Sequence, residues 1–318
     1  MSHVMAPSQL SIDSLPNEII IHVLNSFPTR SLLPLAAVCR RFYGLVGRVY
    51  FTRLVEASRL KDHQVCLECY HPSEKLSTPS LFCDYLGMDG LTEAGDDANL
   101  GELNNLYARF LPYLGDEDHR PRSRRQFGTP FPKAFEPITE LPSHEVFLES
   151  GELFSQLCTV TNLVKVGPRH GLFSSIANVT DSVIRVWRDW LHREAAKAAV
   201  GQQQSISAAD DPSILWTDSL KTVGLKFRVV KDESVPAPIL FGQDEEPSVS
   251  YKLEYEELLI RANWLLLSFE TSEAQQVAHA GSLYFGGSGA VCQPCTAFLQ
   301  CVTPSANQFR MMATTFVM

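Results

Sequence analysis

Four residues between positions 66 and 83 have the types and spacing of a zinc site. Cys66 and Cys69 are separated by two residues, and His71 and Cys83 follow. Thiolate and imidazole groups bind Zn²⁺ tetrahedrally, so these four side chains could hold the ion. Against this, the other Cys-x2-Cys pair lies near the C-terminal end, and the same residues fit free thiols. We favour free thiols over zinc and expect no metal and no cofactor.

Motifs of the common enzyme classes are missing from the sequence. It contains no H-E-x-x-H, no G-x-S-x-G and no D-x-D-x-D-G segment, and its nine histidines are scattered. The Gly-rich stretch 286–289 lacks the Lys-Ser/Thr of a phosphate-binding loop. We therefore expect no catalytic residue and no enzyme activity. The enzyme alternative would require a site that gathers acidic neighbours around His170.

The composition is typical of a globular protein and disfavours two kinds of partner. Apolar residues make up 45% and charged residues 20% of the chain, so most of it should fold. A formal net charge of −9 disfavours nucleic acid as a partner. The first ten residues lack the parts of a secretory signal, and the longest apolar stretch is shorter than the ~20 residues that span a bilayer. We expect no membrane contact and a cytoplasmic or nuclear location.

The N-terminal residues have the pattern of three short helices. An apolar stripe of helical spacing follows Pro16 and ends before Pro28, which stops the helix. Residues 29–31 can cap a second helix, in whose first turn Pro34 is tolerated. Gly44 and Gly47 punctuate a third piece that ends in an apolar cluster. A module of ~45 residues is marginally stable alone, so a partner would stabilise it.

This succession of residues resembles the F-box family. The matching motifs are Leu15-Pro16-x-Glu18-Ile19-Ile20-x-x-Val23-Leu24, then Leu32-x-x-Leu35-x-x-Val38-Cys39-Arg40-x-Phe42, then Tyr50-Phe51. The family usually has a Trp near the end of its last helix, where this chain has Tyr50 or Phe51. The resemblance implies that residues 10–56 bind the Skp-type adaptor of a cullin-RING ubiquitin ligase.

The same resemblance assigns adaptor binding to particular side chains. They are Leu15, Pro16, Ile19, Ile20, Val23, Leu24, Leu32, Leu35, Val38, Cys39, Phe42, Tyr50 and Phe51. For any one of them, such as Ile19, the periodicity alone fits a place in the core of a small helical domain equally well.

Residues 57–142 are expected to form a helical connector followed by a linker. One amphipathic helix is predicted from the spacing of Leu100, Leu103, Leu106, Tyr107, Phe110 and Leu111. Residues 115–142 are rich in Pro, Arg and acidic residues, which is a linker composition. The arginines there fit either a solvated loop or a nuclear import signal: Arg120, Arg122, Arg124 and Arg125.

Residues 143–285 are expected to form a β-rich domain. Alternation of apolar and polar residues predicts half-buried strands over 223–230 and 249–256. A short apolar run before Gly167 is also predicted to be a strand. The continuous apolar runs 258–260 and 264–269 fit a strand or a helix, and their alternating neighbours favour strand.

One helix is expected within this domain. Asp181 can cap a helix that carries Trp187 and Trp190 on one face. Residues 286–318 have no clear period and are expected to form an irregular tail. The predicted fold class is α+β, with a three-helix F-box followed by a sandwich or jelly-roll-like domain and one or two packed helices.

Two functions remain open at this stage. In the first, the F-box binds the adaptor and the β-rich domain binds a protein target for ubiquitin transfer. In the second, the β-rich domain binds a glycan or phosphopeptide through exposed aromatics such as Trp216, or the protein acts outside a ligase. Residues 186–191, 214–216 and 224–229 are similar to the tail of uncharacterised filamentous-fungal F-box proteins, a resemblance that implies no ligand.

Overall fold

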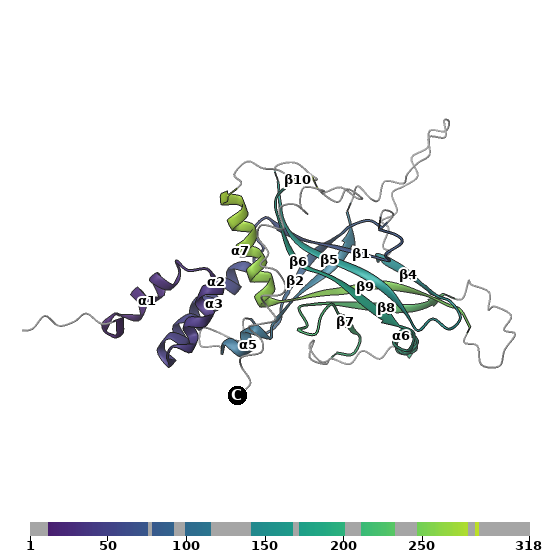
Figure 1. Ribbon diagram of the computed structural model, residues 1–318, viewed down its shortest axis with the longest axis horizontal. Helices are drawn as coiled ribbons and strands as arrows, with labels where there is room; N and C mark the ends of the chain where they lie inside the picture. The colour runs from purple at the N-terminus through teal and green to yellow at the C-terminus, as the bar shows by residue number, and fades with distance from the viewer. Residues whose placement is uncertain are drawn as a thin grey trace, which may run out of the picture.

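The protein consists of a helical module at one end of a curled β-sheet (Figure 1). The computed structural model describes residues 12–75, 78–91, 99–115, 141–167, 172–200, 211–232, 247–278 and 284–285. The predicted linker arginines, His170 and the predicted tail lie outside these residues. The α+β class is confirmed.

The N-terminal module is helical, as the sequence predicts. Its elements are the 3₁₀ turn η1 (Ile12–Ser14), α1 (Asn17–Leu24), α2 (Thr29–Leu32), the 3₁₀ turn η2 (Leu33–Ala37) and α3 (Arg40–Ala57). Pro16 and Pro28 each precede the first residue of a helix, where a missing N–H costs no hydrogen bond. Pro34 lies in the first turn of η2, and α3 continues through both glycines.

The described strands form one antiparallel sheet. They are β1 (His63–Tyr70), β2 (Leu81–Met88), β3 (Tyr107–Leu114), β4 (Ser143–Leu148), β5 (Phe154–Val166), β6 (Leu172–Trp187), β7 (Ile214–Trp216), β8 (Val223–Asp232), β9 (Val249–Arg261) and β10 (Tyr284–Phe285). Their order across the sheet is β10-β6-β5-β1-β2-β3-β9-β8-β7, and β4 pairs with β9 beside β3. The sandwich or jelly roll expected from the sequence is thus refined to a single sheet.

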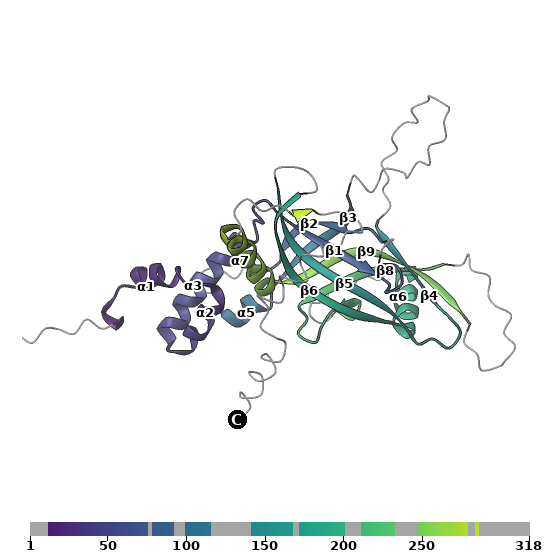
Figure 2. The ribbon, with the colours of Figure 1, turned by 45° about the horizontal axis from the view of Figure 1, so that its top comes forward.

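This sheet curls until its margins approach each other, as the wrapping of β5 and β6 over β8 and β9 shows (Figure 2). Ser182 of β6 donates a hydrogen bond from its hydroxyl to the carbonyl of Thr217, just after β7, at 2.7 Å. The helix α6 (Arg188–Val200) contacts β6 and β8, which belong to these two margins of the sheet. Trp190 of α6 is buried, and its indole N–H donates to the carbonyl of Pro212 at 3.1 Å.

The predicted helical connector differs from the structure. Residues 63–114 contribute β1, β2 and β3, which lie in the middle of the sheet between β5 and β9. The predicted helix over residues 100–111 is wrong beyond its first turn, because α5 (Leu100–Asn104) ends and β3 begins at Tyr107. Pro112 is tolerated within β3 because β9 pairs only with residues 107–110, which leaves one side of β3 unpaired at the proline.

The helix predicted from Asp181 is right only from Arg188, where α6 begins, and the strand predicted for residues 264–269 is wrong. Residues 181–187 belong to β6, because this segment pairs with β5 along its length and alternates between exposed Val183 and buried Ile184. Residues 264–269 belong to the helix α7 (Ala262–Ala278). This helix contacts β5 and β6 as well as α3 and α5, so apolar residues occupy several of its sides and hide its period. No helix within the described ranges is long and apolar enough to cross a membrane.

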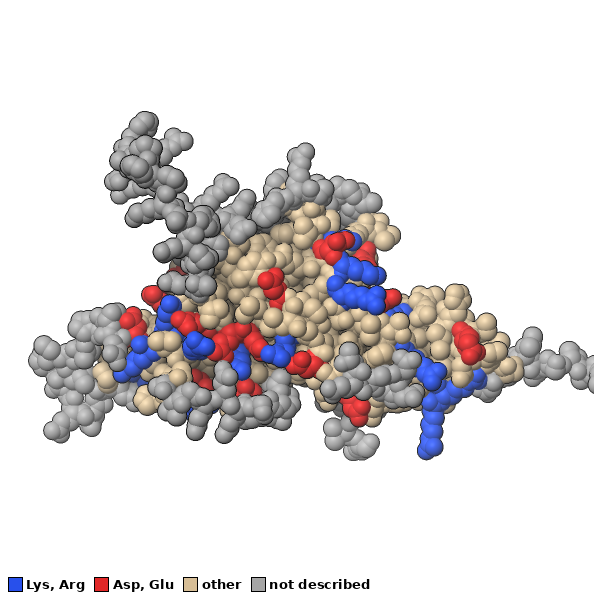
Figure 3. Space-filling view, turned by 180° about the vertical axis from the view of Figure 1, so that it is seen from behind, with Lys and Arg blue, Asp and Glu red and all other residues tan. Residues whose placement is uncertain are grey.

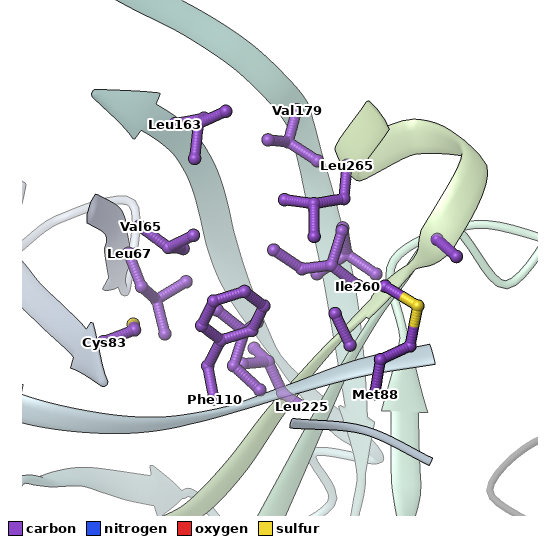
Figure 4. Packing of buried hydrophobic residues seen from close by; sticks show 14 of the residues in the cluster. Val65, Leu67, Cys83, Met88, Phe110, Leu163, Val179, Leu225, Ile260 and Leu265 are labelled. Carbon is purple, nitrogen blue, oxygen red and sulfur yellow. The ribbon is translucent and has the colours of Figure 1, made fainter. Parts of the chain in front are cut away.

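The core lies inside the curl. Side chains from strands on opposite sides of the sheet meet there, among them Leu67, Phe110 and Leu225, and Leu265 of α7 packs on them from one end (Figure 4). Each of these four side chains is fully buried. Burial of a large apolar side chain stabilises the fold by ~1.5–3 kcal/mol, so this cluster is the main support of the sheet.

A short polar chain fastens α7 to this sheet. His63 at the start of β1 hydrogen-bonds through Nε2 to the hydroxyl of Ser272 at 2.9 Å, and that hydroxyl contacts Ser175 of β6 at 2.5 Å. The other ring nitrogen, Nδ1, lies 2.7 Å from the carbonyl of Lys61. Because burial penalises the charged imidazolium, the pKa of His63 is lowered from its usual 6.5.

This burial makes the stability of the protein depend on pH. A histidine whose folded pKa is lowered contributes stability that is present above about pH 6.5 and is lost as the pH falls, since only the unfolded state then binds the proton. We expect His63→Gln to flatten the fall in unfolding free energy between about pH 6.5 and 5 by up to ~1.4 kcal/mol per pH unit. Urea unfolding of both proteins across this range measures the difference, and equal slopes would contradict it.

Candidate functional site

An exposed apolar surface of the helical module runs along α1. Ile19 is 50% exposed and Val23 is 51% exposed, and Leu15 and Phe27 extend the same row at spacings of four residues. Ile19 and Val23 are four residues apart within α1 and so lie on one face of the helix, and Leu15 and Phe27 flank its two ends. We call Leu15, Ile19, Val23 and Phe27 the α1 stripe. It faces away from the core and is free to meet a partner.

Further apolar groups are exposed between α2 and α3. Val38 is 66% exposed, and Cys39, which precedes the first residue of α3, is also exposed. Leu35, Phe42 and Phe51 are half-buried. A partner can therefore reach these predicted binding residues. It can also reach Pro16, which is exposed, and the predicted residues of the α1 stripe, Leu15, Ile19 and Val23.

The remaining predicted binding residues form the core of the module. Ile20, Leu24, Leu32 and Tyr50 are each less than 5% exposed. The hydroxyl of Tyr50 donates to Asn104 of α5 at 3.0 Å, and burial raises the pKa of Tyr50 above its usual 10. These four side chains hold α1, α2 and α3 together. Any effect of these residues on adaptor binding would therefore be indirect, through the fold of the module.

The structure adds exposed apolar residues that the family motif does not assign. Ile12 is 62% exposed, and Phe27, Leu33 and Tyr43 are exposed as well. The spacing of four residues from Leu15 to Phe27 was the signal that could have identified Phe27. The guanidinium of Arg41 donates to the carbonyl of Leu15 and, at 2.8 Å, to the side chain of Asn17. Arg41 therefore fixes the start of α1 and with it the first residue of the stripe.

Charged residues on the sheet form pairs of opposite sign, in contrast to the apolar surface of the helical module. Arg228 of β8 pairs with Glu256 of β9 at 3.4 Å, and Lys252 pairs with Glu254 at 3.6 Å. Arg109 of β3 pairs with Asp89 at 2.8 Å. Figure 3 shows basic and acidic side chains interleaved in a band on this view of the molecule. Exposed pairs of this kind contribute little stability and keep the surface solvated.

The cysteines considered for zinc do not converge. Cys66 and Cys69 lie three positions apart on β1, and side chains at an odd spacing point to opposite faces of a strand. Cys83 is paired with Val65, so it shares the inner face with Cys69. Burial raises the pKa of the Cys66 and Cys69 thiols to about 12, which disfavours the thiolate that a metal requires. No cluster of three metal-ligating side chains occurs in the part of the chain that the structure describes.

The contrast between Ile19 and its neighbour Ile20 gives a test of the two roles. We expect Ile20→Ala to lower the unfolding free energy by ~2–5 kcal/mol, because it leaves a cavity in the core of the module. Ile19→Ala should change it by less than ~0.5 kcal/mol, since its side chain already contacts water. Chemical denaturation of the two variants measures the difference. Equal losses would show that the α1 stripe is part of the core.

Comparison with known proteins identifies the helical module. Residues 12–54 match the family model described as F-box-like. These residues include the α1 stripe and the core side chains Ile20, Leu24, Leu32 and Tyr50. Neither the curated proteins nor the solved structures contain a match to the chain. The chain thus contains an F-box-like domain, and because F-box domains generally bind Skp-type adaptors of cullin-RING ligases, this domain indicates a ubiquitin-ligase adaptor role in general.

Proposed function

We propose that this protein is a substrate receptor of a Skp-cullin-F-box ubiquitin ligase. Its α1 stripe and the exposed residues around Val38 bind the Skp-type adaptor, and its curled sheet domain binds a protein target. The observation that carries the proposal is the α1 stripe, four large apolar side chains held outside the core by a module that matches the F-box-like model. The chain itself performs no chemistry and acts by bringing the target close to the ligase.

The energetics of the stripe support adaptor binding. A half-exposed Ile or Val that becomes buried gains roughly 1 kcal/mol, so the four side chains of the stripe together gain a few kcal/mol. The binding also stabilises a module that is marginal in size, because a partner that binds only the folded state shifts the folding equilibrium.

The far end of the sheet supports a role in target binding. Leu153 and Trp187 are 62% and 46% exposed, and the ring of Trp187 contacts Phe154 at a centroid distance of 5.0 Å. Arg188 holds this end together by donating to the carbonyls of Glu152 and Pro247 at 2.8 and 2.9 Å. In Figure 1 α6, which begins at Arg188, lies at the opposite end of the molecule from α1. A target held there would leave the adaptor surface free.

The alternative of a glycan or phosphopeptide receptor has less support. The aromatic on which it was based, Trp216, is half-buried and packs against Tyr107 at a centroid distance of 5.3 Å. Its role in the structure is to close a small apolar cluster with Ile214 and Leu259. We therefore favour a protein target, and the adaptor role implies the cytoplasm or nucleus as its location.

Adaptor binding is tested with the full chain and a purified Skp-type adaptor. We expect Ile19→Asp combined with Val23→Asp to reduce adaptor binding at least tenfold, because each change places a carboxylate where an apolar contact is required. The matched control is Leu86→Asp, at a residue of β2 with 51% exposure outside the helical module. Isothermal titration calorimetry measures the affinities, and circular dichroism checks that each variant is folded. Absence of binding by the unaltered chain would falsify the proposal.

A further inference from the structure

We infer that Glu270 of α7 is a positioning residue for the adaptor-binding surface, although it lies far outside the F-box-like domain. The inference rests on the proposed function, because it concerns the same surface. Its basis is a group of three side chains, Thr29, Arg53 and Glu270, which we call the clamp. The first two belong to α2 and α3, and the third comes from a helix 241 residues after Thr29.

The carboxylate of Glu270 binds the beginning of α2. It accepts a hydrogen bond from the backbone N–H of Thr29 at 3.1 Å and another from the Thr29 hydroxyl at 2.5 Å. The first N–H groups of a helix have no partner within the helix, so an acceptor from outside α2 satisfies the N–H of Thr29. The residue that precedes α2 is Pro28, and no side chain of the module itself caps this helix. Glu270 supplies that function from outside the module.

The same carboxylate orients Arg53. The Nη1 of Arg53 lies 3.1 Å from Glu270 and donates to the hydroxyl of Thr29 at 2.8 Å. The two side chains are only 15% and 25% exposed, so the pair is partly shielded from water. A guanidinium in such a place requires an acidic partner, because burial of an unpaired charge is costly.

Arg53 in turn fixes the connection between α1 and α2. Its Nη2 donates to the carbonyl of Phe27 at 2.6 Å and to that of Asn25 at 3.2 Å. These carbonyls follow the last turn of α1, so the guanidinium holds the end of the helix that carries the α1 stripe. The clamp therefore sets the direction of α1 relative to α3, and one of its three members belongs to the sheet domain.

The position of α7 explains why this contact is stable. The opposite side of α7 is fastened to β1 and β6 through Ser272, only two residues after Glu270. Both views of the ribbon place α7 between the helical module and the sheet (Figures 1 and 2). Glu270 is thus held in place by the sheet, and the sheet domain takes part in shaping the adaptor surface.

Two full-length variants with the same substitution test the inference. We expect Glu270→Gln to weaken binding of the Skp-type adaptor about tenfold. The loss of a charge-assisted hydrogen-bond network would allow residues 25–29, which connect α1 to α2, to move. The matched control Glu273→Gln changes an exposed acid on the same helix and should leave the affinity unchanged. Hydrogen exchange should accelerate in residues 17–32 of the Glu270 variant and remain unchanged in β5 and β6.

A double-substitution cycle separates the clamp from a general loss of stability. Because Glu270 and Arg53 belong to one network, Arg53→Gln and Glu270→Gln together should cost less affinity than the sum of the two single changes. Additive losses, or adaptor affinity and exchange rates in Glu270→Gln equal to those of the unaltered chain, would overturn the inference. Absence of adaptor binding by the unaltered chain rejects the proposed function instead. The exchange rates then decide alone whether Glu270 positions α1.

Discussion

The packing of α7 against the curled sheet is the interaction on which the rest of the structure depends. Leu265, Leu266 and Phe269 are buried, and the helix contacts β5, β6 and β9. It closes one end of the interior, which would otherwise expose apolar side chains of several strands to water. The same helix presents Glu270 to the F-box-like domain. One helix therefore completes the hydrophobic core on one side and contacts the helical module through Thr29 and Arg53 on the other.

A second constraint acts within α1, where neighbouring residues have opposite roles. Ile19 and Ile20 are about 100° apart around the helix, so one faces water while the other lies in the core. A sequence motif gives both as apolar positions of one type and does not distinguish them. The family resemblance consequently predicted the presence of the domain, whereas the separation of its residues into core and surface required the packing of α1 on α3.

Elsewhere too, the sequence predictions were right where the local pattern decides the structure and wrong where tertiary packing decides it. Strands β8 and β9 were predicted because one face of each is buried, which leaves a clear alternation of apolar and polar residues. Residues 181–187 and 264–269 were assigned wrongly because their state is decided by partners distant in sequence, β5 in one case and the sheet with α3 and α5 in the other. The clamp had no sequence signal at all, because Thr29, Arg53 and Glu270 are common surface residues until the fold brings them together.

The path of the chain makes the F-box of this protein an integrated part of the molecule. After α3 the chain enters β1, returns to the helical module as α5, and returns again as α7 near the end of the sheet. Each return is fixed by polar contacts: Tyr50 binds Asn104 of α5, and Arg53 binds Glu270 of α7. Since β1, β2 and β3 lie in the middle of the sheet, the elements around the F-box cannot be removed without opening the core. The helical module and the sheet domain are therefore joined through α5 and α7 as well as through the chain that follows α3. In the proposed receptor, this junction holds the adaptor near the target.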